Sequence, residues 1–160
     1  MIVWIDGPIH AGKTTVAQRF ALTRPKTVHI EIDQLRHIAT QLPLEACIPF
    51  CIEDAAELTR RWIDRGFHVV LSWPLSKDNL ARFESMVAQP VRAFTLLPPR
   101  HVALAQRGKR ILNHVERERI KEMYDTGMFD HPAGVVIDNQ GETPEQTVER
   151  ILKHLAASAK

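Results

Sequence analysis

The stretch "IVWIDGPIHAGKTTVAQRFAL", residues 2–22, decides the fold. It begins with an apolar run that is typical of a buried strand, and its last ten residues have the periodicity of an amphipathic helix. Between these two segments stands a glycine-rich turn that leads into a lysine and two threonines: Gly7, Gly12, Lys13, Thr14 and Thr15. Such a pattern occurs by accident in roughly one chain of this length in two hundred. Its position between a strand and a helix therefore decides how it is interpreted.

The turn has the context that a phosphate-binding loop requires, which is a strand followed by glycines and then a helix. Gly7 and Gly12 allow backbone conformations that are closed to other residues. The amides of the loop, including those of His10 and Ala11, are then able to surround phosphate oxygens at the positive end of the helix. The alternative is a glycine turn that only caps an amphipathic helix.

The side chains after the second glycine fit the same interpretation. We expect Lys13 to reach the outer phosphates and Thr14 to place its hydroxyl on Mg²⁺. Thr15 is placed to hydrogen-bond the innermost phosphate. Residues 137–146 show no base-specific pattern, and the guanine-reading Asn-Lys-x-Asp of GTPases is absent from the sequence. We therefore expect ATP as the nucleotide.

Strands and helices alternate along the chain. Apolar runs predict strands at residues 2–6, 27–32, 67–72, 91–97 and 134–138. Helical periodicity lies between them, at residues 13–22, 33–40, 52–65, 77–87, 101–123 and 144–155. Thr143, Pro144 and Gln146 supply a capping signature for the last helix. This alternation predicts an α/β fold with a parallel sheet that is covered on both faces.

The chain resembles the P-loop kinases of small molecules and nucleotides, which include shikimate kinase, adenylate-type kinases and chloramphenicol phosphotransferase. Residues 1–17, "MIVWIDGPIHAGKTTVA", look most like the start of the tunicamycin-resistance proteins. The resemblance implies a three-layer fold whose five-stranded parallel sheet has the order 2-3-1-4-5, formed by one domain over residues 1–160. It also implies ATP and Mg²⁺ as cofactors, and an arginine-rich lid at about residues 107–120.

Two acidic side chains lie at the end of the second predicted strand, in "HIEIDQLR", residues 29–36. Strand periodicity places His29, Glu31 and Asp33 on one side. Ligands of open α/β sheets bind at the carboxyl ends of the strands, so we expect both carboxylates at the site. The resemblance assigns Asp33 to the acceptor hydroxyl as the catalytic carboxylate, and Glu31 is then close enough to organise water around Mg²⁺. The alternative is that Asp33 caps the following helix.

Three residues near these carboxylates bear on the acceptor pocket. Arg36 binds an acidic group of the substrate, pairs with Asp33, or is a solvated surface residue. Ser72 ends the third strand where many P-loop proteins have a Mg²⁺-organising aspartate, which makes Glu31 and Asp33 more important. Trp73 either forms an apolar wall of the acceptor pocket or packs in the core.

The segment at residues 100–122 is strongly basic, with seven Lys and Arg against three Glu, in a chain whose net charge is +2. In a continuous helix, Arg107, Arg110 and Arg117 lie on one stripe. By resemblance this segment is a lid that closes over ATP. We assign Arg107 and Arg110 to the transferred phosphoryl group, and Arg107 also to the nucleotide. Arg117 is a further candidate, and Arg119 is not included. The alternative is a solvated helix whose charges pair with one another.

The composition of the 160 residues limits the class of protein and its partners. A net charge of +2 is too small to predict nucleic-acid binding. No apolar stretch approaches the ~20 residues of a membrane span and no secretory signal is visible, so we expect a cytoplasmic protein without a membrane partner. The eight histidines are scattered, and we interpret Cys47 and Cys51 as small core residues rather than metal ligands. The sequence leaves monomer and homodimer open.

These observations predict an ATP- and Mg²⁺-dependent kinase that transfers the γ-phosphoryl group to a hydroxyl of a small molecule, either an antibiotic or a metabolite. A second hypothesis is a nucleoside monophosphate kinase, for which Arg36, Arg60 and Arg61 are present near the acceptor segment. A third hypothesis is a protein that sequesters a drug in the presence of ATP and modifies nothing. If the first hypothesis holds, the resemblance makes antibiotic resistance one possible role.

Overall fold

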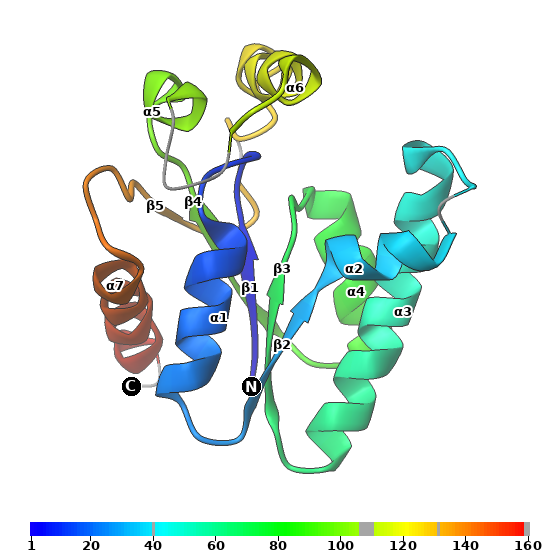
Figure 1. Ribbon diagram of the computed structural model, residues 1–160. Coiled ribbons are helices and arrows are strands. Elements are labelled where there is room, and N and C mark those ends of the chain that lie inside the picture. Colours follow the sequence, from blue (N-terminus) through cyan, green and yellow to red (C-terminus); the bar gives the residue numbers. More distant parts are fainter. Residues whose placement is uncertain (40, 106–110, 131, 159–160) are drawn as a thin grey trace.

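Five parallel strands form one sheet in the computed structural model, which describes residues 1–39, 41–105, 111–130 and 132–158 (Figure 1). The strands are β1 (Ile2–Asp6), β2 (Thr27–Glu31), β3 (His68–Ser72), β4 (Val91–Leu96) and β5 (Val135–Ile137). Their order across the sheet is β2-β3-β1-β4-β5, and every neighbouring pair is parallel. The predicted α/β class and the sheet order 2-3-1-4-5 are therefore confirmed.

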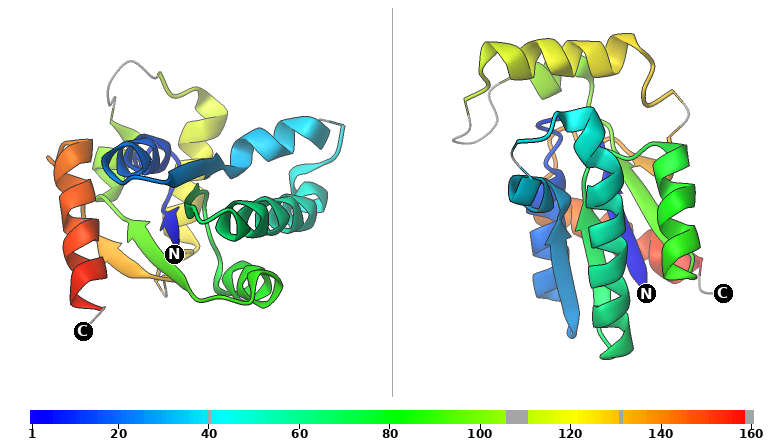
Figure 2. Two further views of the ribbon diagram at one scale, coloured as in Figure 1. Left: turned by 90° about the horizontal axis from the view of Figure 1, so that it is seen from below. Right: turned by 90° about the vertical axis from the view of Figure 1, so that its right-hand side faces the viewer.

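Helices cover both faces of the sheet and the carboxyl ends of its strands (Figure 1). They are α1 (Lys13–Thr23), α2 (Ile32–Arg36), a 3-10 helix (His37–Ala39), α3 (Leu44–Asp64), α4 (Lys77–Val87), α5 (Arg100–Leu104), α6 (His114–Asp125) and α7 (Pro144–Ala157). α1 packs with α7 on one face, and α3 packs with α4 on the other (Figure 2). α5 and α6 lie above the carboxyl ends of the strands (Figure 1). Across the described part of the chain, no helix has the length and apolar character needed to cross a bilayer.

Each face of the sheet has its own core. Ile2 and Trp4 of β1 point toward α3 and α4, whereas Val3 and Ile5 point toward α1 and α7. This alternation is the period of a strand. On the first face, the rings of Trp4 and Phe83 form a T-shaped contact with centroids 5.0 Å apart. Because both sides of β1 are buried, the start of the glycine-rich turn that follows it has a fixed position.

Helix α3 begins at Leu44, and the predicted start at residue 52 is wrong. Pro49 lies inside this helix, where it donates no backbone hydrogen bond. Burial of the apolar side of α3 outweighs that loss, because Cys47 and Cys51 are both buried in the core. Their sulfur atoms lie 3.6 Å apart, and burial raises the pKa of the Cys51 thiol to about 12. The interpretation of the cysteines as small core residues is confirmed.

The helix predicted over residues 101–123 is two separate helices, α5 and α6. The side chain of Asn113 accepts a hydrogen bond from the amide of Glu116, and the carboxylate of Glu116 accepts one from the amide of Asn113. This capping box starts a new helix. The prediction of one continuous basic stripe is therefore wrong. Arg107 and Arg110 of that stripe lie outside the described residues.

Candidate functional site

The loop between β1 and α1 has a backbone that few residue types adopt. Gly7, His10 and Gly12 have positive φ angles of 139°, 68° and 94°. A Cβ atom on Gly7 would lie 2.2 Å from the carbonyl oxygen of Leu96 in β4, so only glycine fits there. The first helical hydrogen bond, of 2.9 Å, runs from the amide of Val16 to the carbonyl of Gly12. The amides of the three residues between them precede that bond and form the positive end of α1.

The side chains of the loop contact the loop itself and the helix above it. The ammonium group of Lys13 donates a hydrogen bond of 2.9 Å to the carbonyl of Pro8. Nδ1 of His10 donates one of 3.0 Å to the carbonyl of Ala103 in α5, the helix that leads into the predicted lid. The loop is therefore joined to the elements that lie above the sheet.

Asp6 is a buried carboxylate that the sequence interpretation missed. Its Oδ1 accepts hydrogen bonds from the amides of Gly7 (2.6 Å) and Leu75 (2.7 Å), and its Oδ2 accepts one of 3.0 Å from the hydroxyl of Thr95. Burial raises the pKa of this carboxyl group, while the three hydrogen bonds and nearby Lys13 oppose the shift. Asp6 thus ties the start of the loop to β4 and to the segment after β3. An acidic residue between an apolar run and a glycine is the sequence signal for it.

Asn139 is a second residue that the sequence interpretation missed. Its Nδ2 donates a hydrogen bond of 2.9 Å to the carbonyl of Ala11, which is 128 positions away in the sequence. The residue is 3% exposed, and its Oδ1 is buried without a partner among the residues that the structure describes. The bond attaches the segment after β5 to the loop between β1 and α1. The position of Asn139 directly after the last predicted strand is the sequence signal that could have found it.

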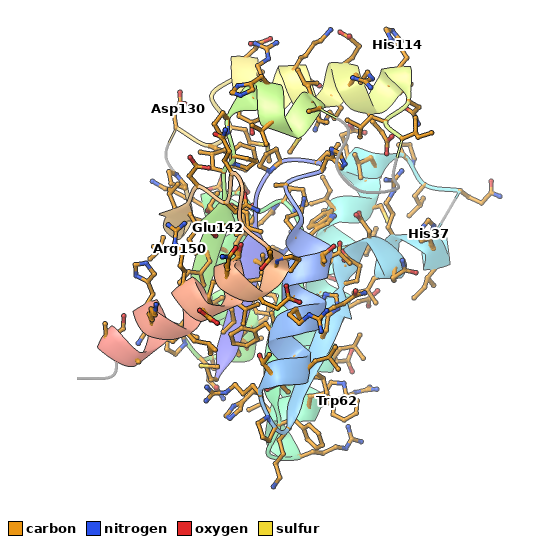
Figure 3. The ribbon with its side chains drawn as sticks, turned by 60° about the vertical axis from the view of Figure 1, so that its left-hand side comes forward. His37, Trp62, His114, Asp130, Glu142 and Arg150 are labelled. Atoms are coloured by element: carbon orange, nitrogen blue, oxygen red, sulfur yellow. The ribbon has the colours of Figure 1, made fainter. Side chains whose placement is uncertain are left out.

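A polar network fixes the segment that carries Asn139. The guanidinium group of Arg150 lies 2.5 Å from one carboxylate oxygen of Glu142 and donates to the carbonyl of Asp138. The other carboxylate oxygen of Glu142 accepts a hydrogen bond of 2.9 Å from the hydroxyl of Thr147. Figure 3 shows the side chains of Glu142 and Arg150 next to one another beside α7. This edge of the site is therefore held by α7.

The carboxylate of Asp33 is held by an indole group. Nε1 of Trp73 donates a hydrogen bond of 2.9 Å to Oδ1 of Asp33. The backbone carbonyl of Trp73 accepts a hydrogen bond of 3.0 Å from Nε1 of Trp4. Trp73 is 6% exposed and packs in the core beside α3 and α4, and it also lines the main cavity described below. The core position of Trp73 therefore fixes the orientation of the Asp33 carboxylate.

The strand β2 ends at Glu31, and the chain turns directly into α2. Strand periodicity stops before Asp33, so the prediction that Asp33 shares a strand face with Glu31 is wrong. The alternative in which Asp33 caps the helix is wrong as well, because Glu31 occupies the N-cap position and Asp33 lies in the first turn. The two carboxylates line different cavities, and Thr14 lines both. Glu31 and Asp33 therefore each share a cavity with Thr14 at the start of α1.

Glu31 belongs to a row of three polar side chains across β2 and β3. The hydroxyl of Ser72 donates a hydrogen bond of 2.9 Å to Oε2 of Glu31, and Nε2 of His29 donates one of 2.6 Å to the Ser72 oxygen. Burial lowers the pKa of His29 to about 4, so its ring is neutral at pH 7. His29 and Glu31 of this row line a cavity of about 480 Å³. At this end of the two strands β2 supplies the carboxylate and β3 supplies the serine that orients it.

A main cavity of about 1030 Å³ joins the other groups. It extends from the loop between β1 and α1 to α2 and the start of α3, and it is also lined by α6 and by the start of α7. The predicted site residues that line it are His10, Gly12, Lys13, Thr14, Thr15, Asp33, Arg36 and Trp73. Gly7 and Ala11 are buried within the loop. The structure thus brings the predicted phosphate ligands and the predicted acceptor residues to one cavity.

Arg119 is the arginine of α6 that lines the main cavity, and it forms an ion pair with Glu122 at 2.6 Å. Arg117, which the sequence interpretation preferred, donates a hydrogen bond of 3.0 Å to the carbonyl of Leu104. The structure thus places Arg119 at the cavity and gives Arg117 a partner in α5. The sequence interpretation put Arg117 on one stripe with Arg107 and Arg110 by assuming a continuous helix, whereas α5 and α6 are separate.

The oxygen donors near the loop are compatible with Mg²⁺ bound to a nucleotide. Among the residues described, no group of three His, Cys, Asp or Glu side chains is placed to hold a metal ion. Mg²⁺ commonly uses one or two protein ligands together with phosphates and water. Thr14 and Glu31 both line the smaller cavity and offer a hydroxyl and a carboxylate. This donor set suits Mg²⁺ better than it suits a metal that needs a full set of protein ligands.

The fold matches solved structures of small-molecule kinases. The tunicamycin resistance protein of Deinococcus radiodurans is 20% identical with a TM-score of 0.65, and the match covers 96% of this chain and 94% of that one. A sugar kinase from a Janibacter species is 21% identical with a TM-score of 0.73, over 97% and 94% of the two chains. A gluconokinase from Sinorhizobium meliloti is 15% identical with a TM-score of 0.67, over 99% and 97%. Shikimate kinases and a thymidylate kinase also match.

The structural neighbours are thus P-loop small-molecule kinases, as the resemblance of the sequence predicted. No protein family model matches the sequence, and no curated protein matches it either. At identities of 21% or less, the likeness to these solved structures shows the fold. Function depends on the chemistry of the site, because one fold hosts many activities.

Proposed function

We propose that this protein, acting as one domain over residues 1–160, transfers the γ-phosphoryl group of ATP to a hydroxyl of a small molecule. The observation that carries the proposal is that a phosphate-binding loop and the carboxylate of Asp33 line the same cavity of about 1030 Å³. Phosphoryl transfer depends chiefly on positioning, and a shared cavity brings donor and acceptor together. The fold shared with small-molecule kinases supports the proposal. An antibiotic is one candidate acceptor, and ATP as the donor makes the cytoplasm the expected location.

The loop would hold the triphosphate through its backbone. The positive φ angles at Gly7, His10 and Gly12 are typical of a loop whose amides surround an anion, and the start of α1 adds its positive end. The amide of Ala11 would exchange its hydrogen bond of 3.2 Å to the Pro8 carbonyl for a phosphate oxygen. Lys13 would exchange its contact with the Pro8 carbonyl for the β- and γ-phosphates. Such an exchange is favourable because a charged phosphate oxygen binds an ammonium group more strongly than a neutral carbonyl does.

Thr14 and Glu31 would hold Mg²⁺, Thr14 through its hydroxyl and Glu31 through water. Both residues line the smaller cavity, which adjoins the phosphate-binding loop. When bound, Mg²⁺ neutralises charge on the phosphate oxygens. Ser72 orients the Glu31 carboxylate by its hydrogen bond of 2.9 Å. Because serine is uncharged, Glu31 supplies the negative charge.

Asp33 would orient the acceptor and take its proton. The acceptor oxygen forms a bond to the γ-phosphorus while the bond from that phosphorus to the β–γ bridging oxygen breaks, so that ADP leaves. The hydroxyl proton passes to the Asp33 carboxylate. The hydrogen bond from Trp73 engages Oδ1, and we therefore assign Oδ2 to the acceptor hydroxyl.

The lid would span about residues 107–120, which include the first part of α6. Arg119 would meet charge on the transferred phosphoryl group, because it lines the cavity. Its ion pair with Glu122 is exposed and is therefore readily exchanged. Arg107 and Arg110 stay in the proposal as further lid arginines, with Arg107 also at the nucleotide.

A nucleoside monophosphate kinase fits the cavity less well. Such an enzyme needs cations around an acceptor phosphate, and Arg36 lines the cavity. Arg60 and Arg61 are instead exposed on α3, where Arg61 pairs with Glu57 at 2.7 Å. A protein that sequesters a drug would use the same cavity without turnover, and a turnover measurement separates it from a kinase.

An acceptor screen tests the proposal. The protein is incubated with Mg·ATP and a panel of hydroxylated small molecules, and products are detected by the mass gain of one phosphate. We expect a product with the native protein and a rate about 100-fold lower with Asp33→Asn, because the variant cannot accept the proton. The matched control Asp64→Asn, on the exposed end of α3, should keep the native rate. Equal rates for Asp33→Asn and native protein would remove Asp33 from the mechanism.

A further inference from the structure

Asp33 shares its cavity with apolar side chains from three parts of the chain. Away from the loop after β1 and from the segment that leads into α7, the cavity is lined by α2, the start of α3, the segment after β3, and α6 with the residues that follow it. The apolar residues there include Leu44, Ile48, Trp73, Pro74, Val115 and Met123. We propose that the acceptor is an alcohol whose hydroxyl group adjoins an apolar body, either an alkyl chain or an aromatic ring. This inference rests on the proposed kinase function and names its substrate class.

Several polar side chains in this part of the cavity are engaged with the protein. Glu116 closes the capping box of α6 by accepting the amide of Asn113 at 3.0 Å. Ser76 is the N-cap of α4 and accepts the amide of Asn79 at 3.2 Å. Arg119 is assigned above to the transferred phosphoryl group. Glu116, Ser76 and Arg119 are therefore less able to bind further hydroxyl groups of a polar acceptor.

Asp33 and Arg36 are the charged groups that α2 contributes to this part of the cavity. A polyol or sugar acid presents several hydroxyl groups, each of which needs a polar partner when it leaves water. A nucleoside monophosphate would bring two negative charges close to the Asp33 carboxylate, with Arg36 to balance them. An alcohol with an apolar body matches the site better, because Asp33 binds its hydroxyl and the apolar side chains contact the rest.

The wall formed by α6 and the segment after it is open to solvent. Val115 lines the cavity and is 75% exposed, and Met128 lines it and is 37% exposed. Apolar surface that faces a ligand cavity gains free energy when an apolar ligand covers it. The hydrogen bonds of Trp73 to Asp33 and Trp4 fix an indole ring beside the carboxylate. The site therefore offers apolar surface from separate parts of the chain.

A series of simple alcohols tests the substrate class. Ethanol, 1-octanol and 2-phenylethanol carry the same primary hydroxyl and differ in the apolar body. With native protein and Mg·ATP, we expect kcat/KM for 1-octanol or 2-phenylethanol to exceed that for ethanol by about 100-fold. Gluconate and AMP should give less product than either apolar alcohol. Faster phosphorylation of gluconate or AMP would overturn this inference and leave the kinase proposal standing.

A wall substitution locates the apolar site. Leu44→Asn puts a polar side chain at the start of α3, and Leu22→Asn is the matched control because Leu22 is 79% exposed on α1, outside the cavity lining. We expect Leu44→Asn to raise the KM for 1-octanol about 10-fold, with the Kd for Mg·ATP unchanged. Leu22→Asn should change neither value. An unchanged KM for 1-octanol in Leu44→Asn would contradict the inference.

Binding without turnover separates the two proposals. Calorimetry of 1-octanol with the protein saturated by Mg·ADP should show saturable binding, weakened about 10-fold by Leu44→Asn. If 1-octanol binds in this way and no alcohol in the acceptor screen is phosphorylated, the apolar site is supported and the kinase proposal fails. If neither 1-octanol nor 2-phenylethanol binds or reacts, the inference is overturned.

Discussion

The indole N–H of Trp73 donates a hydrogen bond of 2.9 Å to the carboxylate of Asp33, so a core residue orients the proposed catalytic group. We predict that Trp73→Phe keeps the apolar contacts and lowers kcat about 10-fold, because a carboxylate without this donor is held less well. The Kd for Mg·ATP should stay at its native value. Steady-state kinetics and calorimetry check both values.

The matched control for this prediction is Trp62→Phe. Trp62 lies on α3 and packs against Phe67, with ring centroids 5.2 Å apart. The same substitution there should leave kcat unchanged. A similar fall in kcat for both variants would mean that loss of a tryptophan, rather than loss of the hydrogen bond to Asp33, causes the effect.

The buried carboxylate of Asp6 predicts opposite results for two substitutions. Asp6→Ala leaves the amides of Gly7 and Leu75 and the hydroxyl of Thr95 without their acceptor, so the free energy of unfolding should fall by about 3 kcal/mol. Asp6→Asn should change it by less than about 1 kcal/mol, because its oxygen still accepts both amides and its NH₂ group is able to donate to the hydroxyl oxygen of Thr95. Urea denaturation measures both. Equal losses would show that the charge of Asp6, rather than its hydrogen bonds, stabilises the loop.

The two arginines of α6 give a test of the lid. Arg119 lines the main cavity, whereas Arg117 binds the carbonyl of Leu104. We predict that Arg119→Met lowers kcat at least about 10-fold, because it removes a cation from the transferred phosphoryl group. Arg117→Met should keep a kcat close to the native value. A larger effect at Arg117 would assign the other face of α6 to the site.

The low pKa of His29 predicts a pH dependence of stability. The pKa of His29 is about 4 in the folded protein, whereas its ordinary value is 6.5. Below pH 6.5 the unfolded chain therefore binds a proton that the folded protein does not, and the free energy of unfolding falls until pH 4. We expect a loss of about 2 kcal/mol, since partial exposure of the ring reduces the full effect. Urea denaturation at pH 7.5 and pH 4.5 measures it.

His29→Gln should reduce this pH dependence, because glutamine still offers an N–H group to Ser72 and does not titrate. The control His37→Gln, at an exposed position beside α2 (Figure 3), should keep the native pH dependence. If His29→Gln loses as much stability between the two pH values as the native protein, another group is responsible.

Local sequence signals predict helix bounds correctly where the chain has clear periodicity and capping residues. α4 has the predicted bounds, and α7 begins at Pro144 with Thr143 as its N-cap. The strand order followed from the resemblance and not from periodicity. The prediction of one helix over residues 101–123 is wrong because Asn113 and Glu116 form a capping box, which starts a new helix in the middle of that range.

Contacts between distant residues account for most of what the sequence did not reveal. Asp6 meets Leu75 across 69 positions, and Asn139 meets Ala11 across 128. Neither pair leaves a periodic pattern, because each depends on how neighbouring strands end at one edge of the sheet. The apolar cavity wall near Asp33 was hidden for the same reason, since it is built from three separate segments.

Calorimetric titration with Mg·ATP tests the central claim most directly, because every proposed role depends on the loop that begins at Gly7. The native protein should bind Mg·ATP with a single site per chain. Lys13→Met should weaken this binding at least about 10-fold, since it removes a charged hydrogen-bond donor to the phosphates. The matched control Lys26→Met, in the exposed turn before β2, should bind as the native protein does. No heat from the native protein, or equal affinity in Lys13→Met, would contradict the account.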